Sequence, residues 1–471
     1  MPLILASNSA SGGYEVDNSL RFNSGSSDYL SRTTWGTPTD AKIFTLSLWV
    51  KRSTLSARNS LVGSYDGVST SSFLFSFESN DTLYIQLGGA SDYILQTTQV
   101  FRDPSAWYHI VYVVDSTQAT SSNRQKLYVN GTQVTSFGTA NYTTLNSTTQ
   151  LFNNSNRNNI GAEWQISGFL NGYISEFYFV DGQALTPSSF GQTDPSVPSS
   201  GIWQPKAYTG SFGTNGFYLQ FKNSAALGTD SSGNGNNFTV NNLTSVDQST
   251  DTPTNNFATW NSIIKTPSTF SNGNLSLASA SGLGDYPGSM ATIVPTKGKW
   301  YAEIKVTKDA NLQIGFITAQ TLIDGNRSLY AQSSNIYWQD NATSIVYFLN
   351  SVSQGNATVT GGTNSVSTYT TNDIIMLAMD LDNGRGWFGK NGTFQNSGNP
   401  ASGTNAFNLA SDYANGTTIF TGCLDANVAA NFGSPSYAAN SYTDGAGFGN
   451  FSYAVPSGYY ALCTKNLAEY A

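Results

Sequence analysis

The sequence has few residues that hold metal ions or form covalent cross-links. Cys423 and Cys463 are its two cysteines, and His109 is its single histidine. Two thiols are too few for a disulfide framework or a tetrahedral zinc site, so we expect a buried pair of free thiols. A single histidine also excludes a histidine-rich metal site.

Charge is scarce as well. Charged residues make up 11% of the chain, and the formal net charge is −8. The sequence has no cluster of Lys and Arg, on which binding to a phosphate backbone depends, so nucleic acid is not an expected partner. No apolar run approaches the roughly 20 residues of a membrane span. The apolar core of residues 1–10 is too short for a secretory signal, so we expect neither membrane insertion nor signal-driven secretion.

Turn-forming and aromatic residues are abundant instead. The chain has 45 glycines, 13% aromatic residues and many Asn, Ser and Thr residues. No amphipathic helix pattern continues beyond about two turns, whereas short alternating segments bounded by turn residues recur. At 471 residues the chain is too long for one core. The expected fold class is all-β, with two antiparallel β-sandwiches.

Residues 373–392, DIIMLAMDLDNGRGWFGKNG, contain the clearest structural pattern. The apolar run 374–379 is typical of a strand covered on both faces. Asn383-Gly384 and Asn391-Gly392 tolerate the positive φ that tight hairpin turns need. These features predict a β-meander. Residues 107–131 repeat the pattern, because WYHIVYVVD ends in an acid and KLYVNG ends in Asn-Gly.

Four blocks in the first half carry a family resemblance. They are FTLSLWVKRS (44–53), WYHIVYVVD (107–115), KLYVNGTQV (126–134) and NGYISEFYFVDGQALTPSSF (171–190). In this order they resemble a laminin-G-like or concanavalin-A-like lectin domain over about residues 20–190. The resemblance implies a jelly-roll sandwich with a short helix at 184–190. It does not define an activity, because this fold hosts many functions.

Five blocks in the second half resemble a SPRY domain over about 190 residues. They are GKWYAEI (298–304), QIGFI (313–317), DIIMLAMDLDNG (373–384), WFGKNG (387–392) and AANFG (429–433). SPRY domains bind proteins or peptides through loops, so the resemblance implies no particular ligand residue. The Asn- and Ser-rich run 341–371 is expected to be a long loop.

These blocks define the predicted domains. Residues 1–13 form an N-terminal lead or attachment segment, and 14–190 form the concanavalin-A-like sandwich. Residues 191–273 form a mostly extended bridging segment that pairs with one or both sandwiches. Residues 274–471 form the SPRY-like sandwich.

The carboxylates do not form a recognisable catalytic pair. Concanavalin-A-like glucanases need two glutamates on one strand, flanking an aspartate. The nearest pattern is Glu15-Val16-Asp17, which has no second Glu nearby, and Glu163 and Glu176 fall on separate predicted strands. His109 lies inside an apolar strand and is expected to be a core histidine. We therefore expect no enzymatic activity and no cofactor.

Two loops nevertheless offer oxygen ligands for calcium. The candidate ligands are Asp230, Asn234 and Asn236 in one loop and Asp380, Asp382 and Asn383 in the other. The alternative is that these side chains bond their own backbone in Asx turns.

Aromatic residues near predicted loops are candidates for stacking on sugar rings. They are Tyr65, Tyr93, Tyr142, Trp164, Trp338 and Tyr347. The alternative is that they pack in the core or at a subunit interface.

Tandem sandwiches with little charge and many Gly, Ser and Asn turns resemble bacteriophage tail-fibre, head-fibre and capsid-decoration proteins. The hypothesis is a structural and adhesive protein at the virion surface, made in the host cytoplasm. Its expected partners are other virion proteins, further copies of the chain (a trimer is favoured) and a host-surface glycan. The rival functions are a carbohydrate-binding lectin module with no virion role and a polysaccharide depolymerase.

Overall fold

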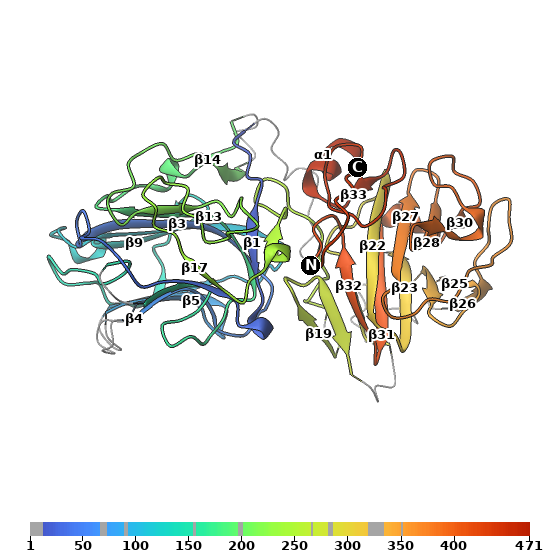
Figure 1. Cartoon of the computed structure of the whole chain (residues 1–471), viewed down its shortest axis with the longest axis horizontal. Helices are drawn as coiled ribbons and strands as arrows, with labels where there is room; N and C mark the ends of the chain where they lie inside the picture. The colour runs from blue at the N-terminus through green and yellow to red at the C-terminus, as the bar shows by residue number, and fades with distance from the viewer. Residues whose placement is uncertain are drawn as a thin grey trace. The chain divides into compact units, whose positions relative to one another are not determined.

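A computed structural model describes residues 13–65, 73–88, 93–153, 157–195, 201–264, 267–280, 286–318, 334–349 and 352–471. The chain forms two compact units, one ending at Thr254 and the other comprising Asn255–Ala471 (Figure 1). They are called here the first and second sandwich. Except for Gly13, the predicted N-terminal lead lies outside the described residues.

The first sandwich consists of two antiparallel sheets, named here after their central strands β3 and β5, and Figure 1 shows them as two layers. In order, the β3 sheet contains β10 (Thr132–Gln133), β9 (Gln125–Val129), β8 (Trp107–Asp115), β3 (Ile43–Arg52), β13 (Gly172–Asp181), β1 (Ser19–Phe22) and β18 (Gln248–Ser249), with β16 (Phe217–Leu219) also paired to β13. The β5 sheet contains β11 (Phe137–Ala140), β7 (Ile94–Val100), β6 (Thr82–Leu87), β5 (Phe73–Phe77), β4 (Asn59–Tyr65), β12 (Arg157–Ile160), β2 (Tyr29–Arg32) and β17 (Thr239–Asn241). A separate pair is formed by β14 (Gly191–Thr193) and β15 (Trp203–Pro205).

Alternating side chains on these strands build the first core. Leu46, Leu48 and Val50 of β3 point inward and are fully buried, as the two-residue period of a strand requires. Phe75 of β5 belongs to the same cluster and comes from the opposite sheet. Burial of one face of each sheet therefore holds the two layers together.

The segment predicted as a bridge divides between the two units. β16, β17 and β18 pair with β13, β2 and β1, so residues 217–249 complete both sheets of the first sandwich. β19 (Ser268–Ser271) belongs instead to the second sandwich. The predicted pairing of this segment is therefore present, but the division between the units falls at Thr254. Long-range pairing of strands of two or three residues leaves little periodic signal in a sequence.

The second sandwich also has two principal sheets, named here after β22 and β23. The β22 sheet contains β19, β20 (Ser276–Ser279), β32 (Asn427–Asn431), β22 (Lys299–Lys308), β27 (Ile374–Asp380), β28 (Arg385–Lys390) and β29 (Thr393–Phe394), with β30 (Phe407–Asn408) paired to β28 and β33 (Tyr460–Ala461) paired in parallel to β22. The β23 sheet contains β21 (Gly288–Met290), β31 (Thr417–Leu424), β23 (Asn311–Thr318), β24 (Asn335–Gln339), β25 (Ile345–Leu349) and β26 (Val352–Asn356). The α-helix α1 (Thr464–Tyr470) ends the chain. The predicted all-β class with two β-sandwiches is confirmed.

The predicted meander is present as β27, β28 and β29. Asn391 and Gly392 form its second turn with φ values of 49° and 89°, as a tight hairpin requires. The first turn has four residues, Leu381–Gly384, rather than the two predicted. The Asp380 carboxylate accepts the N–H groups of Asp382 and Asn383, which stabilises this wider turn.

Two local expectations are corrected. The expected helix at 184–190 is a single 3₁₀ turn, Pro187–Ser189. The expected loop at 341–371 contains β25 and β26, which extend the β23 sheet to its edge.

Cys423 and Cys463 are buried and free, as predicted. Within the described ranges, no helix has the length and apolar character needed to cross a membrane.

Candidate functional site

Of the six aromatic candidates, the structure stacks Tyr65 and Trp164 against each other. Their ring centroids lie 5.0 Å apart and their planes differ by 24°. Tyr65 ends β4, Trp164 follows β12, and both side chains are partly exposed. A partly exposed aromatic pair at a strand end is a suitable surface for the apolar face of a sugar ring.

The other four candidates pack against the cores. Trp338 lies in β24 with 0% exposure and contacts Tyr369 at 5.1 Å between ring centroids, so its prediction as a sugar contact is wrong. Tyr347 packs partly buried against the same core. Tyr93 and Tyr142 pack likewise against the first core.

Gly63 allows the aromatic pair to form. A Cβ atom at this position of β4 would lie 2.4 Å from the backbone nitrogen of Trp164. Glycine therefore lets the segment after β12 lie directly against the outside of β4. Any larger residue would displace this segment and separate the two rings.

A strained turn presents Trp164. Within residues 163–168, the Ile166 N–H donates to the Glu163 carbonyl at 3.0 Å, and Ile166 has a φ of 59°. A β-branched residue in the left-handed region is a true outlier and costs roughly 1–3 kcal/mol. The Ser167 hydroxyl donates to Glu163 Oε1 at 2.6 Å, and Asn159 Nδ2 donates to the Glu163 carbonyl at 2.9 Å. Strain of this kind accumulates at ligand sites.

Polar atoms surround the aromatic pair. Arg157 begins β12 directly opposite Tyr65, and its Nη2 donates to the Trp164 carbonyl at 2.6 Å. The Tyr65 hydroxyl and the Trp164 indole N–H make no hydrogen bond with any described residue. The pair, with Arg157, is called here the aromatic platform.

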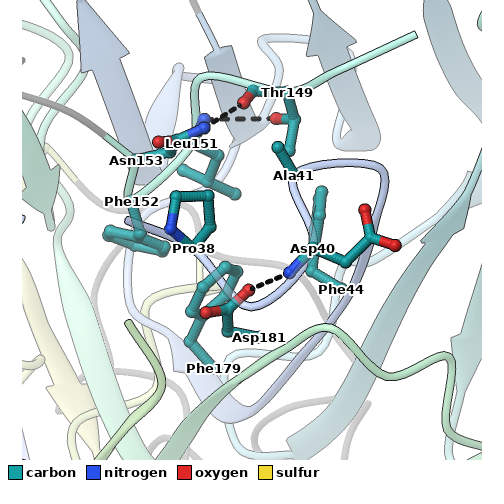
Figure 2. A pocket seen from close by; sticks show the side chains of 10 residues that line it. All are labelled: Pro38, Asp40, Ala41, Phe44, Thr149, Leu151, Phe152, Asn153, Phe179 and Asp181. Atoms are coloured by element: carbon teal, nitrogen blue, oxygen red, sulfur yellow. Dashed lines mark hydrogen bonds between the residues drawn. The ribbon is translucent and has the colours of Figure 1, made fainter. Parts of the chain in front are cut away.

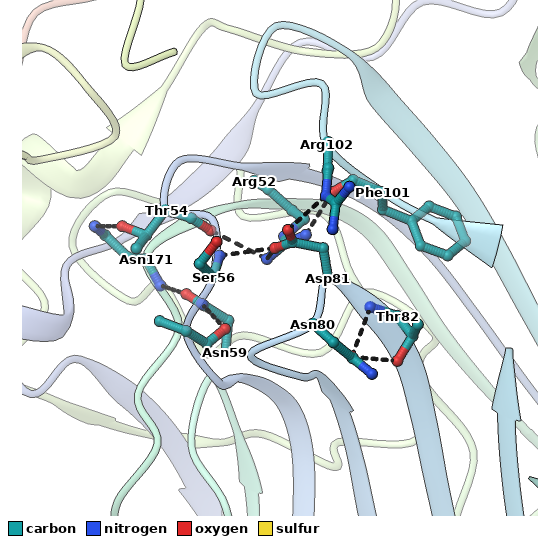
Figure 3. A network of polar contacts seen from close by, with 11 residues as sticks. Arg52, Thr54, Ser56, Asn59, Asn80, Asp81, Thr82, Phe101, Arg102 and Asn171 are labelled. Atoms are coloured by element: carbon teal, nitrogen blue, oxygen red, sulfur yellow. Dashed lines mark hydrogen bonds and ion pairs between the residues drawn. The ribbon is translucent and has the colours of Figure 1, made fainter. Parts of the chain in front are cut away.

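A network of buried polar groups fixes the chain just before β4 (Figure 3). Asp81 Oδ1 accepts the Ser56 N–H at 2.7 Å and pairs with Arg52 at 3.1 Å. The Asn59 side chain accepts the Asn171 N–H at 2.9 Å, which fixes the first residue of β4. The strand that carries Tyr65 is therefore anchored at its start.

The carboxylates considered for catalysis are held by other groups. Arg58 pairs with Glu78 at 2.9 Å and with Glu163 at 3.6 Å, and its hydrogen bond to Glu78 raises the pKa of the Arg58 guanidinium. Glu15 and Asp17 are exposed.

Glu176 occupies a bulge of β13 and is 3% exposed. Its carboxylate accepts hydroxyl groups from Tyr218 at 2.5 Å, Tyr178 at 2.6 Å and Tyr14 at 3.0 Å. Burial raises the pKa of Glu176. Three tyrosines thus enclose this carboxylate. The cluster was not anticipated because Tyr14 and Tyr218 are 162 and 42 residues away from Glu176 in the sequence.

His109 is a core histidine, as predicted. Its ring stacks on Trp49 at 4.8 Å and lies 6.0 Å from the ring of Trp203. Trp203 donates its indole N–H to Nδ1 at 2.9 Å, so Nε2 carries the proton toward the Ser47 hydroxyl at 2.8 Å. Burial lowers the pKa of His109 to about 3.

The two calcium candidates have the bonding of Asx turns. The Asp230 carboxylate accepts the N–H groups of Tyr218, Ser232 and Asn236 at 2.8–2.9 Å, and Asn234 donates to the carbonyls of Gly213 and Gly216. In the other loop, Asp380 also pairs with Lys299 at 3.3 Å, and Asp382 accepts the Gly298 N–H. Within the part of the chain that the structure describes, no group of three or more His, Cys, Asp or Glu residues is arranged to hold a metal ion. The geometry favours turn stabilisation over calcium binding.

We expect Asp230→Ala to lower the free energy of unfolding of the first sandwich by about 3 kcal/mol, because three N–H groups lose their acceptor. Asp230→Asn retains one side-chain oxygen and should lose less. Urea denaturation measures both variants. A fall in the melting temperature of the unaltered protein on adding a chelator would instead support calcium binding.

One small cavity is lined by Asp40 and Asp181 together with Pro38, Phe44 and Phe152 (Figure 2). Its volume is about 10 Å³, which is at the lower limit for a single water molecule. The Asp181 carboxylate accepts the N–H groups of Thr39 and Asp40. The cavity is too small for a sugar ring.

Residues 24–189 match the family described as the concanavalin A-like lectin/glucanases superfamily. The matched residues lie within the first sandwich. No curated protein matches the chain by sequence.

Solved structures with partial similarity include the SPRY domain of human HERC1, with 14% identity, a TM-score of 0.27, and coverage of 36% of this chain and 96% of that chain. A heptameric SAP-like pentraxin from Limulus polyphemus has 15% identity, a TM-score of 0.27, and coverage of 36% and 78%. A protein from Bacteroides ovatus described as a candidate carbohydrate binding protein has 16% identity, a TM-score of 0.31, and coverage of 48% and 59%.

Proposed function

We propose that the chain is a structural and adhesive protein that binds glycans through the aromatic platform of its first sandwich, on the surface of a bacteriophage particle. The observation that carries the glycan-binding part is the stacked pair Tyr65–Trp164 on a lectin-class fold. The proposal extends to further copies of the chain, with a trimer favoured, and to other virion proteins as partners.

The platform has the parts that sugar recognition needs. The stacked rings offer an apolar surface. The Tyr65 hydroxyl and the Trp164 N–H, which bond no described residue, can bond sugar hydroxyls at its edge. The ordered turn 163–168 places Trp164 before a ligand arrives, which reduces the entropy lost on binding. Catalysis is not part of the proposal, because Arg58 holds Glu163 and three tyrosines hold Glu176.

We expect Trp164→Ala to weaken binding to a recognised polysaccharide by about 30-fold, because a central aromatic contact contributes about 2 kcal/mol. Binding of the full chain to a panel of bacterial polysaccharides, followed by calorimetry with the best ligand, measures this loss. Tyr442 is 47% exposed in the second sandwich, and Tyr442→Ala is the control that should bind normally. Equal binding by Trp164→Ala and the unaltered protein would refute the site.

The virion part of the proposal is tested separately. Antibodies to the chain should detect it on purified particles, and cross-linking in solution should give trimers. A monomer that never purifies with particles would leave a free lectin module as the better function. Release of reducing ends from the bound polysaccharide would instead favour a depolymerase.

A further inference from the structure

We infer that the glycan bound at the aromatic platform is anionic, and that the Arg157 guanidinium binds its acidic group. This inference rests on the proposed glycan-binding function and specifies the chemical class of the ligand.

Arg157 has hydrogen-bonding capacity that the described residues do not use. Its Nη2 donates to the Trp164 carbonyl, whereas its Nε–H is buried and has no partner. No carboxylate pairs with Arg157 among the described residues, although its side chain is only partly exposed. The buried Nε–H is shielded from a ligand, as it is in Arg21 and Arg52, so the donors left for a ligand are the remaining N–H groups of the Nη atoms of this partly exposed side chain.

Several other arginines of the first sandwich have more acceptors than Arg157. Arg32 and Arg124 have no carboxylate partner among the described residues, but they donate to two and three oxygen atoms. Buried Arg21 pairs with Asp247 at 3.4 Å, and buried Arg52 pairs with Asp81 at 3.1 Å. Arg58, near the same strand, pairs with two glutamates. Removing a guanidinium charge from water is unfavourable unless a counter-charge compensates it. Arg157 donates to one acceptor, the Trp164 carbonyl, and has no carboxylate partner in the described ranges, so a counter-charge is what a ligand would supply.

An acidic sugar fits this arrangement. The planar guanidinium forms two parallel hydrogen bonds with a carboxylate, which fixes orientation as well as charge. Tyr65 and Arg157 are directly opposite on neighbouring strands, so one monosaccharide can stack on the rings while its acidic substituent reaches the guanidinium. A uronic acid and a sulfated sugar both provide this chemistry, and the experiment below separates them.

The experiment measures binding of the full chain to four probes: polygalacturonate, its carboxyl-reduced neutral form, dextran sulfate and dextran. We expect the unaltered protein to bind polygalacturonate at least 10-fold more tightly than the reduced form, and added salt should reduce this ratio. Arg157→Gln should abolish the preference for the charged polymer, and Arg157→Lys should retain part of it. Arg102, whose side chain is 60% exposed, provides the control Arg102→Gln, which should keep the full ratio.

The outcomes separate this inference from the proposed function. Equal, Trp164-dependent binding of charged and neutral polymers would overturn the inference and leave the glycan site intact. An unchanged ratio in a folded Arg157→Gln protein, with a normal melting temperature, would also overturn it. Preference for dextran sulfate that depends on Arg157 would support the anionic site and assign a sulfated ligand. Absence of binding to every polysaccharide of both panels would remove the proposed function itself.

Discussion

Replacing Asp81 by alanine is expected to lower the free energy of unfolding of the first sandwich by about 4 kcal/mol. The Asp81 carboxylate is 2% exposed, pairs with Arg52 at 3.1 Å and with Arg102 at 2.9 Å, and accepts the Ser56 N–H. The Arg52 side chain is 1% exposed and also lies 4.4 Å from the Phe77 ring. Removing Asp81 leaves a buried cation without its partner, which is the most costly way to break an ion pair.

Urea denaturation of the full chain, followed by hydrogen exchange of peptides from β3 and β6, assigns the loss to the first sandwich. Arg102→Ala is the matched control, because that exposed partner should contribute less than about 1 kcal/mol. A change below about 1 kcal/mol for Asp81→Ala would show that the network in Figure 3 is not needed for stability.

The same network predicts an acid dependence. Burial alone raises the pKa of Asp81, but the hydrogen bonds from Ser56 and Arg102 and the charge of Arg52 outweigh it, so the pKa falls below its usual value. A carboxylate with a lowered pKa in the folded state contributes stability above its unfolded pKa, about 4, and that stability is lost as pH falls through the folded pKa. Asp81→Ala should therefore show a smaller loss of stability between pH 5 and pH 3 than the unaltered protein.

The second large effect is expected at Glu303 in the second sandwich. Glu303 has 0% exposure, and its oxygens accept the N–H groups of Ser452 and Tyr453, the Tyr301 hydroxyl and the Asn431 amide at 2.8–3.1 Å. Glu303→Ala leaves all four donors without this acceptor. We expect a loss of about 4 kcal/mol, since each buried unsatisfied group costs about 1–3 kcal/mol and relaxation recovers part of the sum.

Thermal unfolding measures this loss of stability, and the rate of proteolysis near residues 450–453 reports where it occurs. The Ser452 and Tyr453 N–H groups are hydrogen-bonded to β22 through Glu303. The control is Asp425→Ala, which removes a pair with Lys308 whose side chains are 43% and 49% exposed. That variant should lose less than about 1 kcal/mol. Equal losses for the two variants would contradict the assigned role of Glu303.

Turn residues and apolar runs made parts of the fold predictable from the sequence. Asn391-Gly392 adopts the positive φ values that its hairpin needs, and the apolar run 374–379 lies in a strand that pairs on both sides. The bridging segment was harder to place, because β17 and β18 have three and two residues and pair with strands near the N-terminus. Pairing at such distance depends on the tertiary structure and not on local pattern.

The candidate site was predictable only in part. Tyr65 and Trp164 could be proposed as loop aromatics, but nothing in the sequence indicated that their rings would stack. Trp338 has the same residue type as Trp164, but its prediction as a sugar contact is wrong. It lies in β24, where its side chain is buried in the core of the second sandwich. Arg157 was missed because its place opposite Tyr65 depends on the pairing of β12 with β4, strands far apart in the sequence.

The pairing of the last strands of the first sandwich with its first strands also orders events during synthesis. The Ser19 hydroxyl donates to the Asp251 carbonyl, 232 residues later in the chain. At about 10 residues per second, a ribosome needs roughly 20 s to make that length. During this interval β1 and β2 each lack a neighbour, and an unpaired strand edge can pair with another nascent chain. The first sandwich is therefore completed by its last-made strands, so the emerging polypeptide passes through a period in which it is open to misassembly.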